Sequence, residues 1–270
     1  MTARGPQRGW LALLAATVAF APAVAIADQL NFVSCPLVRD TASVPCWLAE
    51  HDGELYFLTI QSDVSAPVTP PWLGHRVLVE GTISNEPRIC GGVVLKPVHL
   101  SVMSERDASC STILPAEERY NLTFEPPRPP GPSGGRLAFA PGPAAAPPAA
   151  GSPPPAARPT TREFVVSYAF DGLVAFNHSG LLSEVLAFAR ANNAKSVEIM
   201  GYRGAVRLSN GQTMVEEASI AQRRAEQLAM LLRGANLTAP EYKVQWQTRP
   251  SPADGVDDHL MRRAVITVRQ

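Results

Sequence analysis

Four cysteines are the residues whose type and spacing most clearly suggest chemistry. Cys35, Cys46, Cys90 and Cys110 are the only cysteines in the 270 residues. An even number in an exported chain predicts two disulfide bonds. A zinc site is the alternative, but the sequence has no C-x2-C spacing and no paired histidines to complete it. Three pairings are possible, and proximity along the chain favours Cys35–Cys46 with Cys90–Cys110.

No other motif in the sequence suggests catalysis. The stretch Gly131–Gly135 fits the G-x-S-x-G pattern of a hydrolase nucleophile but lies in a proline-rich segment, where the required strand and helix are not expected. There is no P-loop and no H-E-x-x-H motif. The histidines are scattered, and none pairs with another at metal-ligand spacing; they are His51, His75, His99, His178 and His259. We therefore predict a protein that is not an enzyme and holds no metal or cofactor.

The N-terminus has the pattern of an export signal. Two arginines precede the apolar run Trp10–Ala25, and Ala25-Ile26-Ala27 is a small-x-small cleavage site. This pattern predicts a cleaved signal peptide over residues 1–27. A retained membrane anchor is the alternative, but Pro22 interrupts a run that is already short for a bilayer. No later run is long enough to span a membrane, so we expect no transmembrane span in the mature chain.

Proline content divides the mature chain into three parts. Half of the 26 prolines lie between Pro126 and Pro159, and so proline-rich a segment cannot form a core. We therefore predict a disordered linker over residues 126–161. It joins a β module, residues 28–125 with net charge −7, to a C-terminal module, residues 162–270 with net charge +2. The whole chain has zero net charge, which removes the usual electrostatic argument for binding nucleic acid.

Short strands separated by turn residues make the β module all-β. Asp52-Gly53 is a hairpin turn signal before the apolar run Leu55–Ile60. Arg76–Glu80 forms a second strand, and Val93–Met103 alternates apolar and polar residues. The order of these segments resembles OB-like barrels, which often bind oligonucleotides. An acidic surface repels phosphate, so we expect a module for interaction instead.

The C-terminal module has the periodicities of an α+β fold. Apolar residues predict one helix after Ser179, with Ser179 as its N-cap, and a long helix over Val215–Arg233. A polar loop, Arg203–Thr213, precedes the long helix. The predicted strands are Phe164–Phe170, Ser196–Met200, Tyr242–Thr248 and Ala264–Val268. The resulting order is βαβαββ, a sandwich of one sheet and its helices.

Four stretches of this module, taken in order, resemble the OmpA-like family of peptidoglycan-associating domains. They are Tyr168-Ala169-Phe170-Asp171, Val197–Tyr202, Ile220–Ala225 and Arg262–Ile266. The resemblance covers about the last 40% of the chain. It implies that the module binds the diaminopimelate of a peptidoglycan stem peptide. In the family an aspartate engages the amino-acid end of the ligand, and an arginine pairs with its carboxylate, which a guanidinium can grip in two-pronged fashion.

The match to the family's ligand residues is partial. Arg224 stands at the arginine position, whereas Gly204 stands where the family has its aspartate. Glu216 or Glu217 is a candidate for the missing charge; the alternative is that both form the usual acidic first turn of a helix. The ligand-binding residues that the resemblance implies are Arg224, Glu217, Tyr202, Arg203 and Arg262. As alternatives, Arg224 pairs with neighbours on its own helix, and Arg262 and Arg263 are charges at a strand edge.

These features predict a periplasmic protein of the cell envelope, associated with the outer membrane or the cell wall. Its OmpA-like domain is expected to bind peptidoglycan while the β module interacts with an envelope protein partner. The alternative is a degenerate OmpA-like domain that no longer binds peptidoglycan and acts as a docking module for proteins. An enzyme in the β module is a third possibility, without a supporting set of residues.

Overall fold

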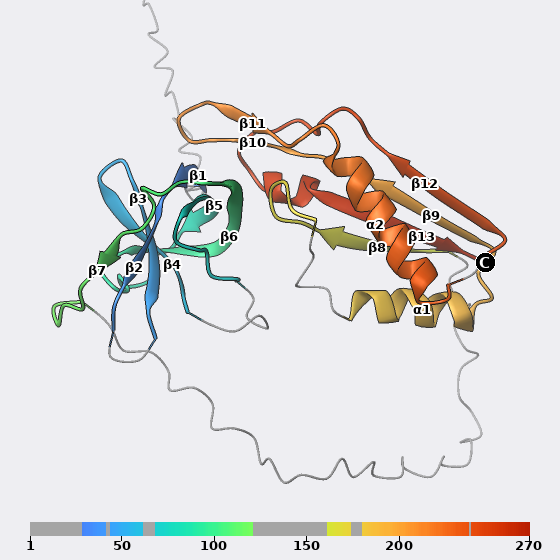
Figure 1. Cartoon of the computed structure of the whole chain (residues 1–270), viewed down its shortest axis with the longest axis horizontal. Helices are drawn as coiled ribbons and strands as arrows, with labels where there is room; N and C mark the ends of the chain where they lie inside the picture. Colours follow the sequence, from blue (N-terminus) through green and yellow to red (C-terminus); the bar gives the residue numbers. More distant parts are fainter. Residues whose placement is uncertain (1–28, 42–43, 62–67, 121–160, 174–179, 238) are drawn as a thin grey trace, which may run out of the picture.

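The computed structural model describes residues 29–41, 44–61, 68–120, 161–173, 180–237 and 239–270. The β module and the C-terminal module lie side by side in it (Figure 1). The predicted signal peptide 1–27, the predicted linker up to residue 160 and Ser179 lie outside the described residues. The predicted α+β class and the two predicted disulfides are confirmed. In the described part of the chain, no helix is both long and apolar enough to cross a membrane.

The β module consists of strands. They are β1 (Gln29–Ser34), β2 (Pro36–Arg39), β3 (Cys46–His51), β4 (Glu54–Ile60), β5 (His75–Ile83), β6 (Val93–Arg106) and β7 (Ile113–Leu114). They form one sheet in the order β1-β5-β6-β4-β3-β2-β7. Only Cys35 separates β1 from β2, although the two strands lie near opposite ends of this order. The sheet therefore curls until its two ends meet at Cys35.

The predicted hairpin joins β3 to β4. Asp52 and Gly53 both have positive φ, 51° and 77°. A two-residue turn with positive φ at both positions matches the right-handed twist of the strands it connects, which is why Asp-Gly is favoured there.

Side chains of β5 are buried on both faces of the sheet. Val77 and Val79 point into the core of the β module, where they meet Phe32. Leu78 and Glu80 alternate with them and are also buried, at 0% and 1% exposed. Because successive residues of a strand face opposite sides, Leu78 and Glu80 point out of the β module. The C-terminal module covers them.

The C-terminal module contains a four-stranded sheet with two helices. Its elements are β8 (Thr161–Ser167), α1 (Leu181–Ala191), β9 (Ser196–Gly201), β10 (Ala205–Arg207), β11 (Thr213–Val215), α2 (Ile220–Gly234), β12 (Glu241–Trp246), the 3-10 helix η2 (Asp258–Met261) and β13 (Arg263–Arg269). The sheet order is β12-β9-β13-β8. Both helices share one hydrophobic core with the sheet, in which Val185 of α1 and Leu228 of α2 are buried.

Two local predictions for this module were wrong. The segment Arg203–Thr213 is not only a loop, because β10 and β11 pair as a hairpin that extends toward the β module (Figure 1). The long helix begins at Ile220 rather than Val215, since Val215 pairs with Ala205 in that hairpin. Glu216 and Glu217 therefore precede the helix, and its first turn contains no acidic residue.

The predicted cysteine pairing was also wrong. The disulfides are Cys35–Cys110 and Cys46–Cys90. In the β2–β3 ladder Arg39 lies opposite Cys46, so Cys35 lies four residues further along the sheet. Four residues of strand correspond to about 13 Å, and a disulfide requires Cα atoms within about 7 Å. Cys35 and Cys46 are therefore too far apart in space to form a disulfide, although they are close in the sequence.

Candidate functional site

Arg224 of α2, the predicted carboxylate-binding residue, is fully buried. Its side chain has 0% exposed surface, as does that of Glu216. Arg224 Nη2 donates to Glu216 Oε1 at 2.6 Å, and Nη1 donates to Glu216 Oε2 at 2.9 Å. The guanidinium thus forms the bidentate pair that was predicted for the carboxylate of a ligand. The carboxylate, however, belongs to the same chain.

The remaining donors of Arg224 are also used. Nε donates to the carbonyl of Gly172 at 3.0 Å, Nη1 to the carbonyl of Tyr202 at 3.0 Å, and Nη2 to the carbonyl of Ala169 at 3.1 Å. A guanidinium has five N–H donors, and all five have an acceptor here. No donor of Arg224 is left for a peptidoglycan stem peptide in this conformation.

Glu216 is held from both sides. Besides the guanidinium, its Oε1 accepts the backbone N–H of Asp171 at 2.8 Å, and its Oε2 accepts that of Gly204 at 2.7 Å. A buried carboxylate is stable only when it is paired and hydrogen-bonded, and this one is both. The acidic partner of Arg224 is therefore Glu216. Glu217 is exposed and pairs with Arg223 at 3.2 Å instead.

The environment of the pair shifts two neighbouring pKa values. Tyr168 lies under Arg224, whose Cζ is 4.7 Å from the ring centroid. Burial raises the pKa of Tyr168 to about 12, although the guanidinium opposes this shift. Burial also raises the pKa of Asp171, whose carboxylate accepts the backbone N–H of Glu217 at 2.7 Å. Both shifts have the sign expected of acids removed from water.

Tyr202 and Arg203 lie in the same loop, after β9, but support the pair rather than face an open cavity. The carbonyl of Tyr202 binds Arg224, while its ring packs under Arg263, whose Cζ is 5.4 Å from the ring centroid. The guanidinium of Arg203 donates to the backbone carbonyl of Glu216, and to that of Thr248 at 3.3 Å. Both residues thus hold the segment around Glu216 in place.

Arg262 joins the two modules and is not a strand-edge charge. Its side chain is 1% exposed, and its guanidinium forms a bidentate ion pair with Glu80 of β5, with one contact of 3.0 Å. Burial raises the pKa of Glu80, and the positive charge of Arg262 opposes that rise. Each module therefore buries a charge whose partner belongs to the other module.

Further contacts surround this ion pair. Asn31 Nδ2 donates to the carbonyls of Arg207 and Gly255 at 3.0 and 2.8 Å. The backbone N–H of Phe170 donates to Ser101 Oγ at 2.8 Å. We call the following residues the inter-module contact: Asn31, Val33, Leu78, Glu80, His99, Ser101 and Met103 of the β module, with Phe170, Val206, Leu208, Ser209, Met214, Gly255, His259 and Arg262 of the C-terminal module.

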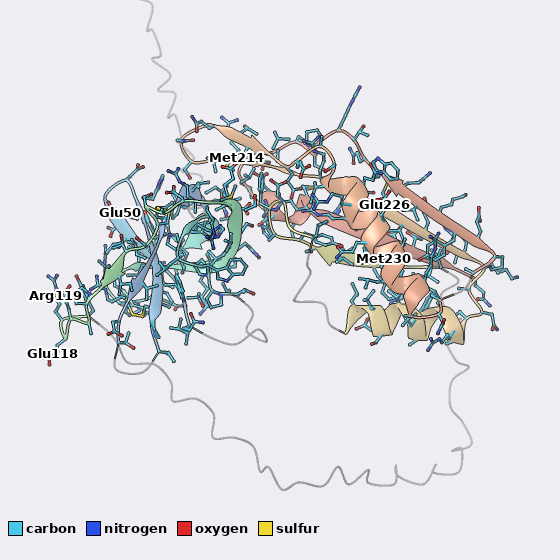
Figure 2. All side chains as sticks on the ribbon, viewed as in Figure 1. Glu50, Glu118, Arg119, Met214, Glu226 and Met230 are labelled. Atoms are coloured by element: carbon cyan, nitrogen blue, oxygen red, sulfur yellow. A yellow bond between two sulfur atoms is a disulfide. The ribbon has the colours of Figure 1, made fainter. Side chains whose placement is uncertain are left out.

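The contact lies at the junction visible in the centre of Figure 2, where side chains of β5 and β6 meet the β10–β11 hairpin and η2. At its middle, Leu78 packs with Phe170, Val206 and Leu208 in one hydrophobic cluster. Arg262, one of the residues predicted to bind the ligand, thus contacts the chain's own β module.

Sequence reasoning missed Glu80 and the apolar residues around it. A signal was available, because Val77-Leu78-Val79 is a continuous apolar run in a strand expected to alternate. Such a run is typical of a strand buried on both faces. It indicated a second packing partner for β5, but not which part of the chain supplied it.

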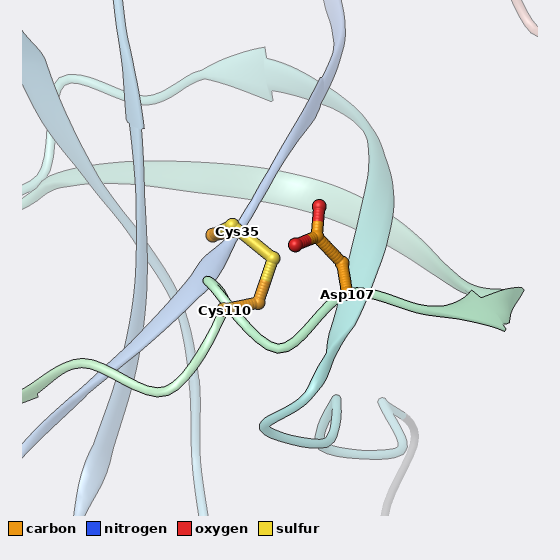
Figure 3. Close-up of side chains that lie close together, drawn as sticks. All are labelled: Cys35, Asp107 and Cys110. Carbon is orange, nitrogen blue, oxygen red and sulfur yellow. A yellow bond between two sulfur atoms is a disulfide. The ribbon is translucent and has the colours of Figure 1, made fainter.

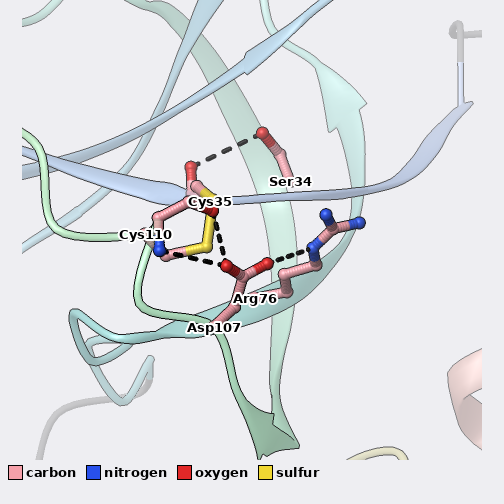
Figure 4. The surroundings of a disulfide bond; sticks show 6 residues. Ser34, Cys35, Arg76, Asp107 and Cys110 are labelled. Atoms are coloured by element: carbon pink, nitrogen blue, oxygen red, sulfur yellow. Dashed lines mark hydrogen bonds and ion pairs between the residues drawn. A yellow bond between two sulfur atoms is a disulfide. The ribbon is translucent and has the colours of Figure 1, made fainter.

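A cluster near the first disulfide has the composition of a metal site. Atoms of Cys35, Asp107 and Cys110 lie within 4.8 Å of one another (Figure 3). Both sulfurs belong to the disulfide, so neither can serve as the thiolate that zinc requires. Asp107 instead accepts bonds from Ser109 and from Arg76 Nε, the latter at 2.9 Å (Figure 4). Ser109 and then Arg76 lower the pKa of Asp107 to about 2. Asp107 therefore ties the segment that follows β6 to Arg76 of β5 beside the disulfide.

No model of a protein family matches this chain, and no curated protein matches its sequence.

Proposed function

We propose that this chain is a non-enzymatic periplasmic protein of the cell envelope, in which an OmpA-like domain serves as a docking module for an OB-like β module. In this proposal the C-terminal module no longer binds peptidoglycan. The single observation that carries the proposal is the burial of Arg224, whose five donors are all satisfied within the chain. A receptor for a free carboxylate needs a donor that the ligand can reach.

The inter-module contact supports the docking role. Glu80 is buried against Arg262, and a buried charge without a partner is costly. The β module would therefore expose or neutralise Glu80 if the two modules separated. A surface that holds another folded module is a protein-docking surface. Here the docked module is the β module of the same chain.

The assignment of the two modules to these folds rests on the order of their elements. In the C-terminal module, β8, α1, β9, α2, β12 and β13 follow the predicted βαβαββ order, with β10 and β11 inserted. In the β module, β1 and β2 act as one strand bent at Cys35 that closes the sheet on itself. The pairs β4–β6 and β2–β7 are parallel and the other strand pairs of this module are antiparallel. A small, partly closed barrel is also typical of OB-folds, which supports the proposed assignment.

A peptidoglycan co-sedimentation assay tests the proposal. Full-length mature protein is incubated with purified peptidoglycan, and the bound fraction is measured after centrifugation with and without free diaminopimelate. We expect no binding above that of an unrelated protein. Saturable binding that diaminopimelate competes away, and that Arg224→Ala abolishes in a variant shown to be folded, would overturn the proposal and restore the receptor role.

A further inference from the structure

A pair of histidines spans the inter-module contact. His99 of β6 and His259 of η2 stack with ring centroids 3.6 Å apart and an interplanar angle of 21°. His99 lies at the rim of the contact with one side open to solvent, while His259 is half-buried. Two neutral rings at this distance are in direct van der Waals contact.

The surroundings of the pair disfavour positive charge. Burial lowers the pKa of both histidines, and Arg262, the buried cation of the inter-module contact, lowers it further. His259 Nδ1 is buried and has no hydrogen-bond partner within the described residues. A protonated imidazole is a donor at both nitrogens, so this atom would carry an unsatisfied N–H. Protonation would also bring two like charges together across the stack.

The neighbouring acids do not remove this penalty. Asp257 favours protonation of both rings, but burial and the adjacent cations outweigh it. Asp258 is buried and already accepts the backbone N–H groups of Arg207, Asp254 and Gly255. Glu80 is occupied by Arg262. Among the described residues, Asp257 is therefore the one acid that favours a charged histidine, and it does not outweigh burial.

We propose that His99 and His259 form an acid-sensitive clasp between the two modules, which holds them together when both rings are neutral and loosens when they are protonated. The proposal depends on the inter-module contact, and it holds whatever the chain binds. The clasp would make the docking of the two modules dependent on pH.

The direction of the pH effect follows from the pKa shifts. The pKa of His259 falls from 6.5 to about 4 in the docked chain, because of burial and then of His99 and Arg262, and that of His99 is lowered too. A residue with a lowered pKa contributes its full stability above its ordinary pKa and loses it as the pH falls toward the lowered value. The stabilisation of docking by His259 is therefore complete above pH 6.5, is lost progressively as the pH falls to about 4, and stays lost below that pH. His99 acts in the same direction. Glu80 has a raised pKa and acts in the opposite direction.

Amide hydrogen exchange of the intact mature chain tests the clasp directly. The backbone N–H of Phe170 donates to Ser101 across the contact, so its protection reports docking. After correction for intrinsic exchange rates, we expect its protection to fall at least tenfold between pH 7 and pH 4.5. The amide of Ile266, in the core of the C-terminal module, should keep its protection.

Three comparisons decide the outcome. In the double variant H99Q/H259Q the loss of protection with falling pH should disappear, whereas His75→Gln, a histidine of the β module bonded to Met103, should keep it. An unchanged loss in the double variant would overturn the clasp. A titration of the wild-type rings by NMR needs no variant, and a pKa near 6.5 for His259 would overturn it as well. Absence of protection at Phe170 at pH 7 would contradict docking itself.

Discussion

Gly204 has no side chain, and the Arg262 side chain runs past its Cα toward Glu80 of the β module. A Cβ atom added to Gly204 would lie 2.7 Å from Cγ of Arg262, closer than two carbon atoms approach without repulsion. Gly204 also stands where the resembled family has its ligand-binding aspartate. A side chain at position 204 and the observed path of the Arg262 side chain therefore exclude each other.

Gly204→Ala should weaken the inter-module contact. The added methyl group forces the Arg262 side chain away from Glu80, and overpacking of this kind typically costs about 1–3 kcal/mol of unfolding free energy. Urea denaturation of the mature protein measures the change. The matched control is Gly234→Ala at the end of α2, where an added Cβ meets nothing within 4 Å; it should be neutral or slightly stabilising. Equal effects of the two variants would contradict this explanation of Gly204.

Arg224→Ala should destabilise the fold strongly. It leaves the buried carboxylate of Glu216 without its cation, and removing one partner of a buried ion pair costs about 3–5 kcal/mol. The control is Glu217→Gln, whose side chain is exposed and whose loss should stay within about 0.5 kcal/mol. Chemical denaturation of both variants checks the difference. An Arg224→Ala protein as stable as the wild type would contradict a stabilising role for this buried ion pair.

Tyr168 should make the chain sensitive to alkali. Its pKa is 10 when exposed and about 12 in the folded chain. A raised pKa contributes stability that is complete below pH 10 and is lost as the pH rises toward 12, because only the unfolded chain releases the proton in that window. Two units correspond to about 3 kcal/mol. Unfolding free energies measured at pH 9 and pH 11 should show about half of this loss, about 1.4 kcal/mol, in the wild type and a smaller loss in Tyr168→Phe.

Local patterns in the sequence predicted β4, β5 and β6 of the β module, and both α-helices and the four main-sheet strands of the C-terminal module. The hairpin at Asp52-Gly53 and the strand ended by Gly201 were predictable because turn geometry and strand alternation depend on neighbouring residues. The Cys46–Cys90 pairing was not, because it depends on which strands lie next to each other after the sheet has curled.

In the candidate site, too, local patterns predicted some features, whereas others depended on contacts between distant parts of the chain. Arg224 was identified as a residue that grips a carboxylate, and the structure gives it one, from Glu216. Which acid it would be depended on the β10–β11 hairpin, whose pairing moves the start of the helix past Glu216. The role of Arg262 required knowing that Glu80, distant by 182 residues, faces it across the inter-module contact. A pattern of neighbouring residues cannot show a contact between residues so far apart in the sequence.

The central proposal is that the C-terminal module holds the β module through the inter-module contact. Brief trypsin treatment of the mature protein offers a cut between them at Arg136, because Arg128 and Arg158 are each followed by proline. We predict that the two halves co-elute from a size-exclusion column at neutral pH as one species of the uncut size. The cut Arg262→Ala protein should release them, because Glu80 then lacks its partner. Two separate peaks from the cut wild-type protein would contradict the account.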